Sequence, residues 1–234
     1  MQELSDIHII RRYDEELYDL HSRVMELGAL VVKQLCAILD ALKAEDAELA
    51  RRIMATDHQA NLMAADADTR VFSLLARRCP VASDLRRVIA AAKVVNDLER
   101  VGDEVAKVAQ FLVHACRETG TDPHPGMLRE IRVMGKMAVG LLRQSLQVFD
   151  VEDEELARRH ERESREMDGE FQSALRKLIT YVMEDARNIS NAIEIVLVLK
   201  ALERIGDHAQ KIVDYVVFRR AGEDARLAEL AAPE

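Results

Sequence analysis

Leu98-Glu-Arg-Val-Gly-Asp103 recurs as Leu202-Glu-Arg-Ile-Gly-Asp207, 104 residues further along the chain. The same offset aligns the surrounding apolar residues, which are spaced three or four apart like one face of an α-helix. A chance match of six residues would not extend to every position of a helical stripe, so the chain is predicted to contain two homologous units. The first stripe is Val94, Leu98, Val101, Val105, Val108 and Leu112, and its counterpart is Val198, Leu202, Ile205, Ala209, Ile212 and Val216.

Helical periodicity extends through almost the whole sequence. Proline disfavours helix in the residue before it, so a helix is expected to end just ahead of Pro80. A loop rich in helix-breaking residues divides the chain near its middle, at residues 119–126. One helix is predicted to contain residues 17–42. Five more are predicted at about 46–78, 83–117, 127–149, 152–184 and 189–220.

These patterns predict an all-α fold of two tandem three-helix bundles related by a pseudo-twofold repeat. Each bundle is expected to close its own core. The predicted boundaries are 1–118 for the first bundle, 119–126 for the linker, 127–221 for the second bundle and 222–234 for a flexible tail.

Composition narrows the possible functions of the 234 residues. The formal net charge of −9 argues against nucleic-acid binding, which needs a basic face. Three cysteines, without paired spacing, favour a reducing compartment over a disulfide framework. No apolar run approaches the roughly 20 residues that cross a bilayer, and the segment from Met1 to Asp14 does not look like a signal peptide. A cytoplasmic location is therefore expected, with membrane contact only peripheral through partners.

The repeated motif carries two acids one helical turn apart in each copy, Glu99 with Asp103 and Glu203 with Asp207. Their position relative to the apolar stripe predicts that the carboxylates point toward solvent. Two like charges at this spacing destabilise a helix. Because hard metal ions favour clustered oxygen ligands, each acidic pair is a candidate metal site. An ordinary solvated face, with arginines close by, is the alternative reading. The glycine in each copy is expected to permit close helix approach.

Other polar groups are less specific. Asp57 and Asn61 on the second predicted helix, and Glu163 and Asp168 on the fifth, could complete each acidic pair or could be ordinary polar surface. Four arginines flank the turn around Pro80 and could bind an anion or an acidic partner, or form a solvated basic turn. They are Arg77, Arg78, Arg86 and Arg87.

The two hexapeptides, one three-helix unit apart, resemble the PhoU family. Further matching segments are Asp57-His-Gln-Ala-Asn61, Cys79-Pro-Val-Ala-Ser-Asp-Leu-Arg86 and Thr180-Tyr-Val-Met-Glu-Asp-Ala-Arg187. The resemblance extends from about Tyr13 to Phe218.

The resemblance implies two three-helix bundles and a negative regulator of phosphate uptake and of the phosphate-starvation two-component response. Such a protein acts as an adaptor between the ATPase subunit of the phosphate ABC transporter and the sensor histidine kinase, and homodimers are common. Neither catalytic nor organic cofactor-binding residues are implied, so the protein is not expected to be an enzyme. Charged stripes at 96–107 and 200–211 are the expected docking faces.

The resemblance also implies surface clusters of metal ions such as iron, zinc, manganese or magnesium. In the first bundle the matching positions are Glu99 and Asp103 with Asp57 and Asn61. In the second bundle they are Glu203 and Asp207 with Asp168, Ser164 and the neighbouring Glu163. An amide replaces one acid in the first site and a serine replaces one in the second. The first site is expected to bind metal more tightly, because Asn61 is a neutral oxygen donor whereas Ser164 is a weak one.

Two other functions compete with the adaptor. A ferritin-like di-iron oxidase requires a glutamate three residues before a histidine, projecting into a bundle core, and the sequence has no such pair. The remaining alternative is a metal-binding or metal-buffering bundle without a signalling role.

Overall fold

The computed structural model describes residues 2–115 and 125–221, apart from the side chains of residues 2–11, 57, 125, 127, 188 and 221. Within these ranges the chain contains six α-helices, one short 3-10 helix and no strand. The elements are α1 (Gln2–Ala44), α2 (Ala47–Arg78), α3 (Ala82–Ala115), α4 (Pro125–Val151), α5 (Glu154–Glu184), η1 (Ala186–Asn188) and α6 (Ile189–Ala221). The predicted all-α fold is confirmed.

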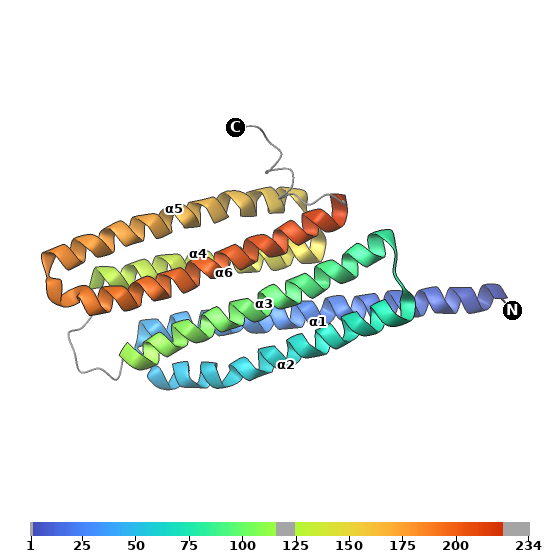
Figure 1. The fold of residues 1–234 in the computed structure, drawn as a ribbon, viewed down its shortest axis with the longest axis horizontal. Helices are drawn as coiled ribbons and strands as arrows, with labels where there is room; N and C mark the ends of the chain where they lie inside the picture. Colours follow the sequence, from blue (N-terminus) through green and yellow to red (C-terminus); the bar gives the residue numbers. More distant parts are fainter. Residues whose placement is uncertain (1, 116–124, 222–234) are drawn as a thin grey trace.

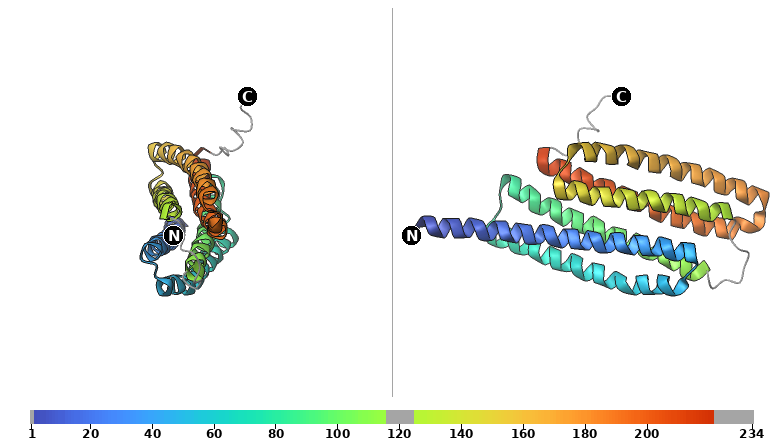
Figure 2. Two further views of the ribbon diagram at one scale, coloured as in Figure 1. Left: turned by 90° about the vertical axis from the view of Figure 1, so that its left-hand side faces the viewer. Right: turned by 180° about the vertical axis from the view of Figure 1, so that it is seen from behind.

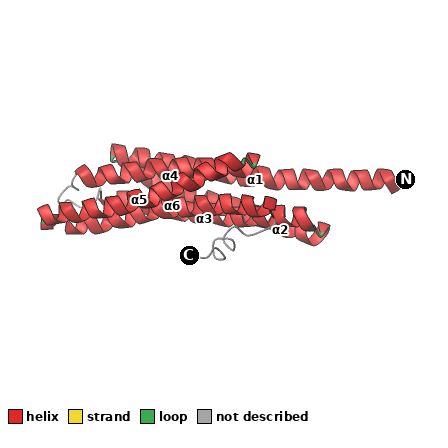
Figure 3. Ribbon diagram, turned by 90° about the horizontal axis from the view of Figure 1, so that it is seen from above, coloured by secondary structure: helices red, strands yellow, loops and turns green. Residues whose placement is uncertain are grey.

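The helices lie along one long axis in two groups (Figure 1). Helices α1, α2 and α3 form one three-helix unit, and α4, α5 and α6 form the other. The left view of Figure 2, along that axis, shows the two units stacked on each other. The right view shows that α1 extends beyond the other helices at its N-terminal end. Figure 3 shows the same elongated arrangement from above. None of the described helices contains a stretch that is long and apolar enough to cross a membrane.

Local signals explain where the helices begin and end. Asp46 and Asp153 cap α2 and α5, their side chains accepting hydrogen bonds from backbone N–H groups of the first turn. Helix α2 stops at Cys79, which has a left-handed backbone (φ 46°) and precedes Pro80. Helix α4 begins at Pro125, inside the predicted linker, since proline suits the first position of a helix. The rest of that linker, apart from Gly126 in α4, and the tail lie outside the described residues.

The core follows the repeated apolar stripe. All twelve residues of the two stripes are at most 4% exposed, which confirms the periodicity. The expectation of two separate cores is wrong, because the buried residues of both units form one continuous cluster. Helices α3 and α6, which carry the repeated motif, pack against each other as extensively as α3 packs against α2 of its own unit.

Polar contacts reinforce this junction. Asp97 on α3 lies 2.6 Å from Nδ1 of His208 on α6. Arg204 on α6 pairs with Glu104 on α3 at 3.4 Å. The two copies of the motif therefore lie on helices that face each other across the middle of the molecule.

Candidate metal centre

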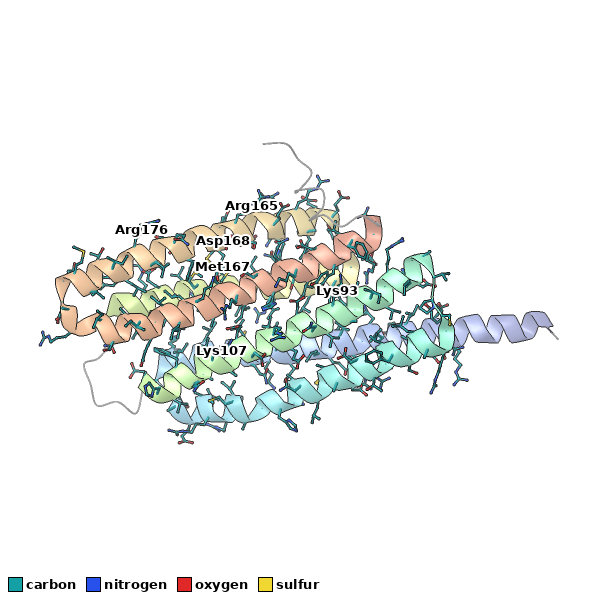
Figure 4. The ribbon with its side chains drawn as sticks, in the orientation of Figure 1. Lys93, Lys107, Arg165, Met167, Asp168 and Arg176 are labelled. Carbon is teal, nitrogen blue, oxygen red and sulfur yellow. The ribbon has the colours of Figure 1, made fainter. Side chains whose placement is uncertain are left out.

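Three carboxylates of the second unit come together between α5 and α6. Asp168 belongs to α5, and Glu203 and Asp207 occupy successive turns of α6. Figure 4 labels Asp168 and Met167 on the side of α5 nearest α6, whereas Arg165 and Arg176 lie on its outer side. The structure thus brings together the three acids that were predicted for the second site.

Electrostatics show how closely these acids interact. Partial desolvation, followed by the negative charge of Glu203, raises the pKa of Asp168. Partial desolvation raises the pKa of Asp207 as well, and both Glu203 and Asp168 add to that shift. The three carboxylates therefore repel one another in the absence of a bound cation.

Lys200 is the positive neighbour of this group. Its ammonium pairs with Glu203, one turn along α6, and lies 5.4 Å from the ring centroid of Phe171 on α5. The carboxylates were predicted to point toward solvent, but only 13% of the Glu203 side chain is exposed. For Glu203 that prediction is wrong. The helical wheel of one unit could not reveal this, since the burial depends on neighbouring helices.

Clustered carboxylate oxygens are ligands for hard cations, which this group could hold. Among the described side chains, no set of three His, Cys, Asp or Glu groups has a ready metal-binding arrangement. A cation would therefore have to draw the three acids closer together and displace Lys200 from Glu203.

Glu163 does not join this group. Its carboxylate accepts hydrogen bonds from Gln144 of α4 at 2.6 Å and from Arg159 at 2.8 Å. The hydrogen bond from Arg159 is the main reason why the pKa of Glu163 is lowered. Ser164 is half-buried on the next position of α5. The predicted second site is thus brought together without Glu163.

The first unit places its predicted ligands on two neighbouring helices, α2 and α3. Glu99 and Asp103 on α3 and Asn61 on α2 are all half-buried, and these two helices pack side by side. Neither acid forms a hydrogen bond or ion pair with another side chain of the described set. The side chain of Asp57 lies outside the described residues. The ranking that places this site first stays a prediction.

The motif glycine of the second unit explains how α5 approaches α6. A Cβ built on Gly206 would lie 2.8 Å from Sδ of Met167 and 3.5 Å from Leu141. An added Cβ would therefore force the Met167 side chain to move. The glycine lets this side chain of α5 pack directly against the backbone of α6.

Comparison with known protein families identifies the same two units. The PhoU domain model matches residues 24–112 and again residues 131–216, once in each three-helix unit. The chain belongs to the PhoU family. It is 39% identical over 219 residues to a phosphate-specific transport system accessory protein PhoU homolog from Pseudomonas aeruginosa, covering 94% of this chain and 89% of that protein. It is 32% identical to phosphate-specific transport system accessory protein PhoU from Escherichia coli, with the same coverage.

Solved PhoU structures share the fold. The crystal structure of PhoU from Pseudomonas aeruginosa matches with a TM-score of 0.85 and 38% identity, covering 90% of this chain and all of that one. The phosphate transport system regulatory protein PhoU from Streptococcus pneumoniae matches with a TM-score of 0.81 and 27% identity, covering 91% and 98%. The relatives are accessory and regulatory proteins of phosphate transport, and the predicted family is confirmed.

Proposed function

We propose that this protein is a cytoplasmic, non-enzymatic adaptor that represses phosphate uptake and the phosphate-starvation response when phosphate is plentiful. It would bind the ATPase subunit of the phosphate ABC transporter and the sensor histidine kinase, and would act as a homodimer. The nearly full-length match to transport accessory proteins supports this proposal.

An exposed apolar row on α6 is the structural observation that carries the proposal. Ile189, Ile193 and Leu197 lie one turn apart and are 54%, 60% and 67% exposed. Ile179 and Met183, near the end of α5, are also exposed. Contiguous apolar surface of this kind is typical of protein contact sites.

A groove beside this row adds a second contact surface. It measures about 610 Å³ between α3 and α6, and its apolar walls include Phe111, Val113 and Leu197. The same groove is lined by Glu104, Lys107, Lys200 and Arg204 of the predicted charged stripes, so part of the expected docking faces lies next to the apolar row. Asp97 and His208 of those stripes instead contact each other at the junction between the units.

A deletion strain tests the regulatory role. At high phosphate, loss of the protein should leave a phosphate-starvation reporter switched on, and reintroducing the gene should switch it off. A reporter that stays repressed in the deletion strain would contradict the proposal.

Purified proteins test the docking face. Ile193→Ser with Leu197→Ser should weaken binding to the transporter ATPase or to the kinase cytoplasmic domain. Leu62→Ser, which changes an exposed leucine on α2, is the matched control and should bind like wild type. Equal weakening by the control would place the contact elsewhere, and size measurements on the same samples would report whether the chain dimerises.

Metal binding without a signalling role is the second candidate function, and the Asp168, Glu203 and Asp207 group favours it. In that case, a variant lacking these acids would lose metal while the starvation reporter stayed repressed. If signalling requires the metal, the same variant would also switch the reporter on.

A further inference from the structure

The exposed apolar row of α6 continues directly into the groove between α3 and α6. Leu197 belongs to both, and Ala201 and Arg204 extend the same side of α6 along the groove. From Ile189 to Arg204 this surface is about 22 Å long, which is the length of an α-helix of about 15 residues. Phe111 of α3 contributes to the opposite apolar wall. An amphipathic helix places its apolar face in a groove of this kind.

Three cations line this groove and are exposed at its rim. They are Lys107 of α3 and Arg204 and Lys200 of α6, and 54%, 50% and 43% of their side chains are exposed. The acid that pairs with two of them, Glu104, is only 7% exposed. The part of the rim that a partner would meet is therefore positive, although the whole chain carries a net charge of −9.

Neighbouring carboxylates hold these three cations in place. Glu104 accepts a hydrogen bond from Lys107 at 2.7 Å and pairs with Arg204 at 3.4 Å. Lys200 pairs with Glu203 on the same helix. One buried carboxylate thus orders two exposed cations and leaves an excess of one positive charge beside the groove. Side chains that are already ordered lose less conformational entropy when a partner binds.

The other acid of the lining lies toward the opposite end of the groove. Glu194 pairs with His114 at 3.5 Å. Ten residues of α6 separate Glu194 from Arg204, a distance of about 15 Å along the helix. The groove therefore has an apolar end, which includes one paired acid, and a positive end. A helix with an apolar face and acidic residues at one end complements both.

We propose that this groove binds an amphipathic helix of a partner protein, whose acidic side chains meet Lys107, Lys200 and Arg204. The apolar side chains of that helix would pack against Leu197 and Phe111. A basic helix would meet like charges at the rim and bind less tightly. This inference rests on the proposed docking function and adds the chemistry that the partner must supply.

Two synthetic amphipathic peptides of about 16 residues test the groove. They share one leucine face and differ only in carrying glutamate or lysine in one terminal turn. Fluorescence anisotropy with the purified full-length protein should show saturable binding of the glutamate peptide, about tenfold or more tighter than that of the lysine peptide. Lys107→Glu with Arg204→Glu should reverse this preference.

The repeat supplies a matched control. Lys211→Glu with Arg100→Glu changes the same residue types at the equivalent positions of the repeat, where both side chains are exposed and neither lines the groove. This control should bind both peptides like wild type.

A second variant covers misfolding of the charge-reversed protein, since reversing both charges leaves the buried Glu104 beside two acids. Leu197→Glu alters a side chain that is 67% exposed, so it should fold normally. It should weaken binding of the glutamate peptide about tenfold, because it adds a like charge to the apolar wall. Circular dichroism of each variant reports its fold, and if the charge-reversed protein does not fold, the Leu197→Glu result decides.

Three results would overturn the proposal: no saturable binding of either peptide up to about 1 mM, equal affinity for both peptides, or an equal change in the control. Self-association that Leu197→Glu abolishes, without peptide binding, would overturn it as well, because the groove would then be an interface between copies. If the transporter ATPase or the kinase domain still binds and Ile193→Ser with Leu197→Ser weakens it, the docking function stands. In that case only the chemistry proposed for the partner is wrong.

Discussion

Asp97 and His208 join the two three-helix units through a contact of 2.6 Å between Oδ1 and Nδ1, with only 10% and 15% of the two side chains exposed. Removing one partner from such a buried pair leaves the other without its hydrogen bond. Asp97→Ala should therefore lower the free energy of unfolding by about 1–3 kcal/mol.

A double-mutant cycle in urea measures this coupling. His208→Ala and the double variant complete the cycle, and Asn96→Ala, which alters an exposed neighbour on α3, should change stability by less than about 0.5 kcal/mol. Additive effects of Asp97→Ala and His208→Ala would show that the pair contributes nothing of its own.

Replacing two glycines on neighbouring helices with alanine should change the stability of the protein differently. A Cβ on Gly169 of α5 meets nothing within 4 Å, so Gly169→Ala should stabilise the protein by about 0.5–1 kcal/mol. At Gly206 the same methyl group meets Met167, and the clash should cancel or reverse that gain. Thermal unfolding of both variants makes the comparison. An equal gain in both would mean that the Met167 side chain moves aside without cost when Gly206 gains a methyl group.

The acidic group should make stability depend on pH in a defined direction. Because the pKa of Asp207 is raised in the folded state, the folded protein holds its proton to higher pH than the unfolded chain. The resulting loss of stability begins as pH rises through the unfolded value of about 3.9. It is complete above the folded pKa and persists at neutral pH.

Asp207→Asn removes this effect. At neutral pH and without divalent metal, the variant should be more stable than wild type by about a few tenths of a kcal/mol, since solvent screens an exposed group. Near pH 3 the difference should shrink or disappear. Urea denaturation at both pH values is the measurement. A less stable variant at neutral pH would contradict mutual repulsion among the three acids.

Metal titration compares the two predicted sites. Each site offers three carboxylates, but Asn61 supplies a neutral oxygen donor in the first, whereas Ser164 is a weak donor in the second. We therefore expect Glu99→Ala with Asp103→Ala to remove more Mn²⁺ binding than Glu203→Ala with Asp207→Ala. Calorimetry on proteins stripped with a chelator measures the difference, and a larger loss from the second pair would show that the ranking is wrong.

The helices themselves were predictable because each depends on local signals. The periodic stripes and the break before Pro80 place α2 and α5 within about two residues of the observed ends, where Asp46 and Asp153 act as caps. Helix α4 begins earlier than predicted, because proline reads equally well as a breaker and as a first helical residue.

The site was predictable only in part, because it depends on packing between helices. Spacing identified Glu203 and Asp207, and the family resemblance added Asp168, whereas the burial of Glu203 comes from neighbours on other helices. The engagement of Glu163 by Gln144 could not be read from α5 alone. Lys200 has a local signal that was overlooked, since it lies three residues before Glu203 on the same helix. Arg219 has no sequence signal, because its burial against Phe149 and its ion pair with Glu152 depend on packing between helices.

The groove between α3 and α6 has an equivalent region, 104 residues away in the repeat, where side chains contact each other. The offset of 104 residues pairs Leu197, Ala201, Glu104 and Phe111, which line the groove, with Lys93, Asp97, His208 and Tyr215. At the counterpart, the ammonium of Lys93 lies 5.1 Å from the ring centroid of Tyr215, and Asp97 reaches His208. The short side chain of Ala201 cannot reach Glu104, and Oε2 of Glu104 is buried without a hydrogen-bond partner among the described groups. The two halves of the repeat therefore present different surfaces at equivalent positions. A partner that fits the groove cannot bind its counterpart in the same way, so it can bind this chain in only one orientation.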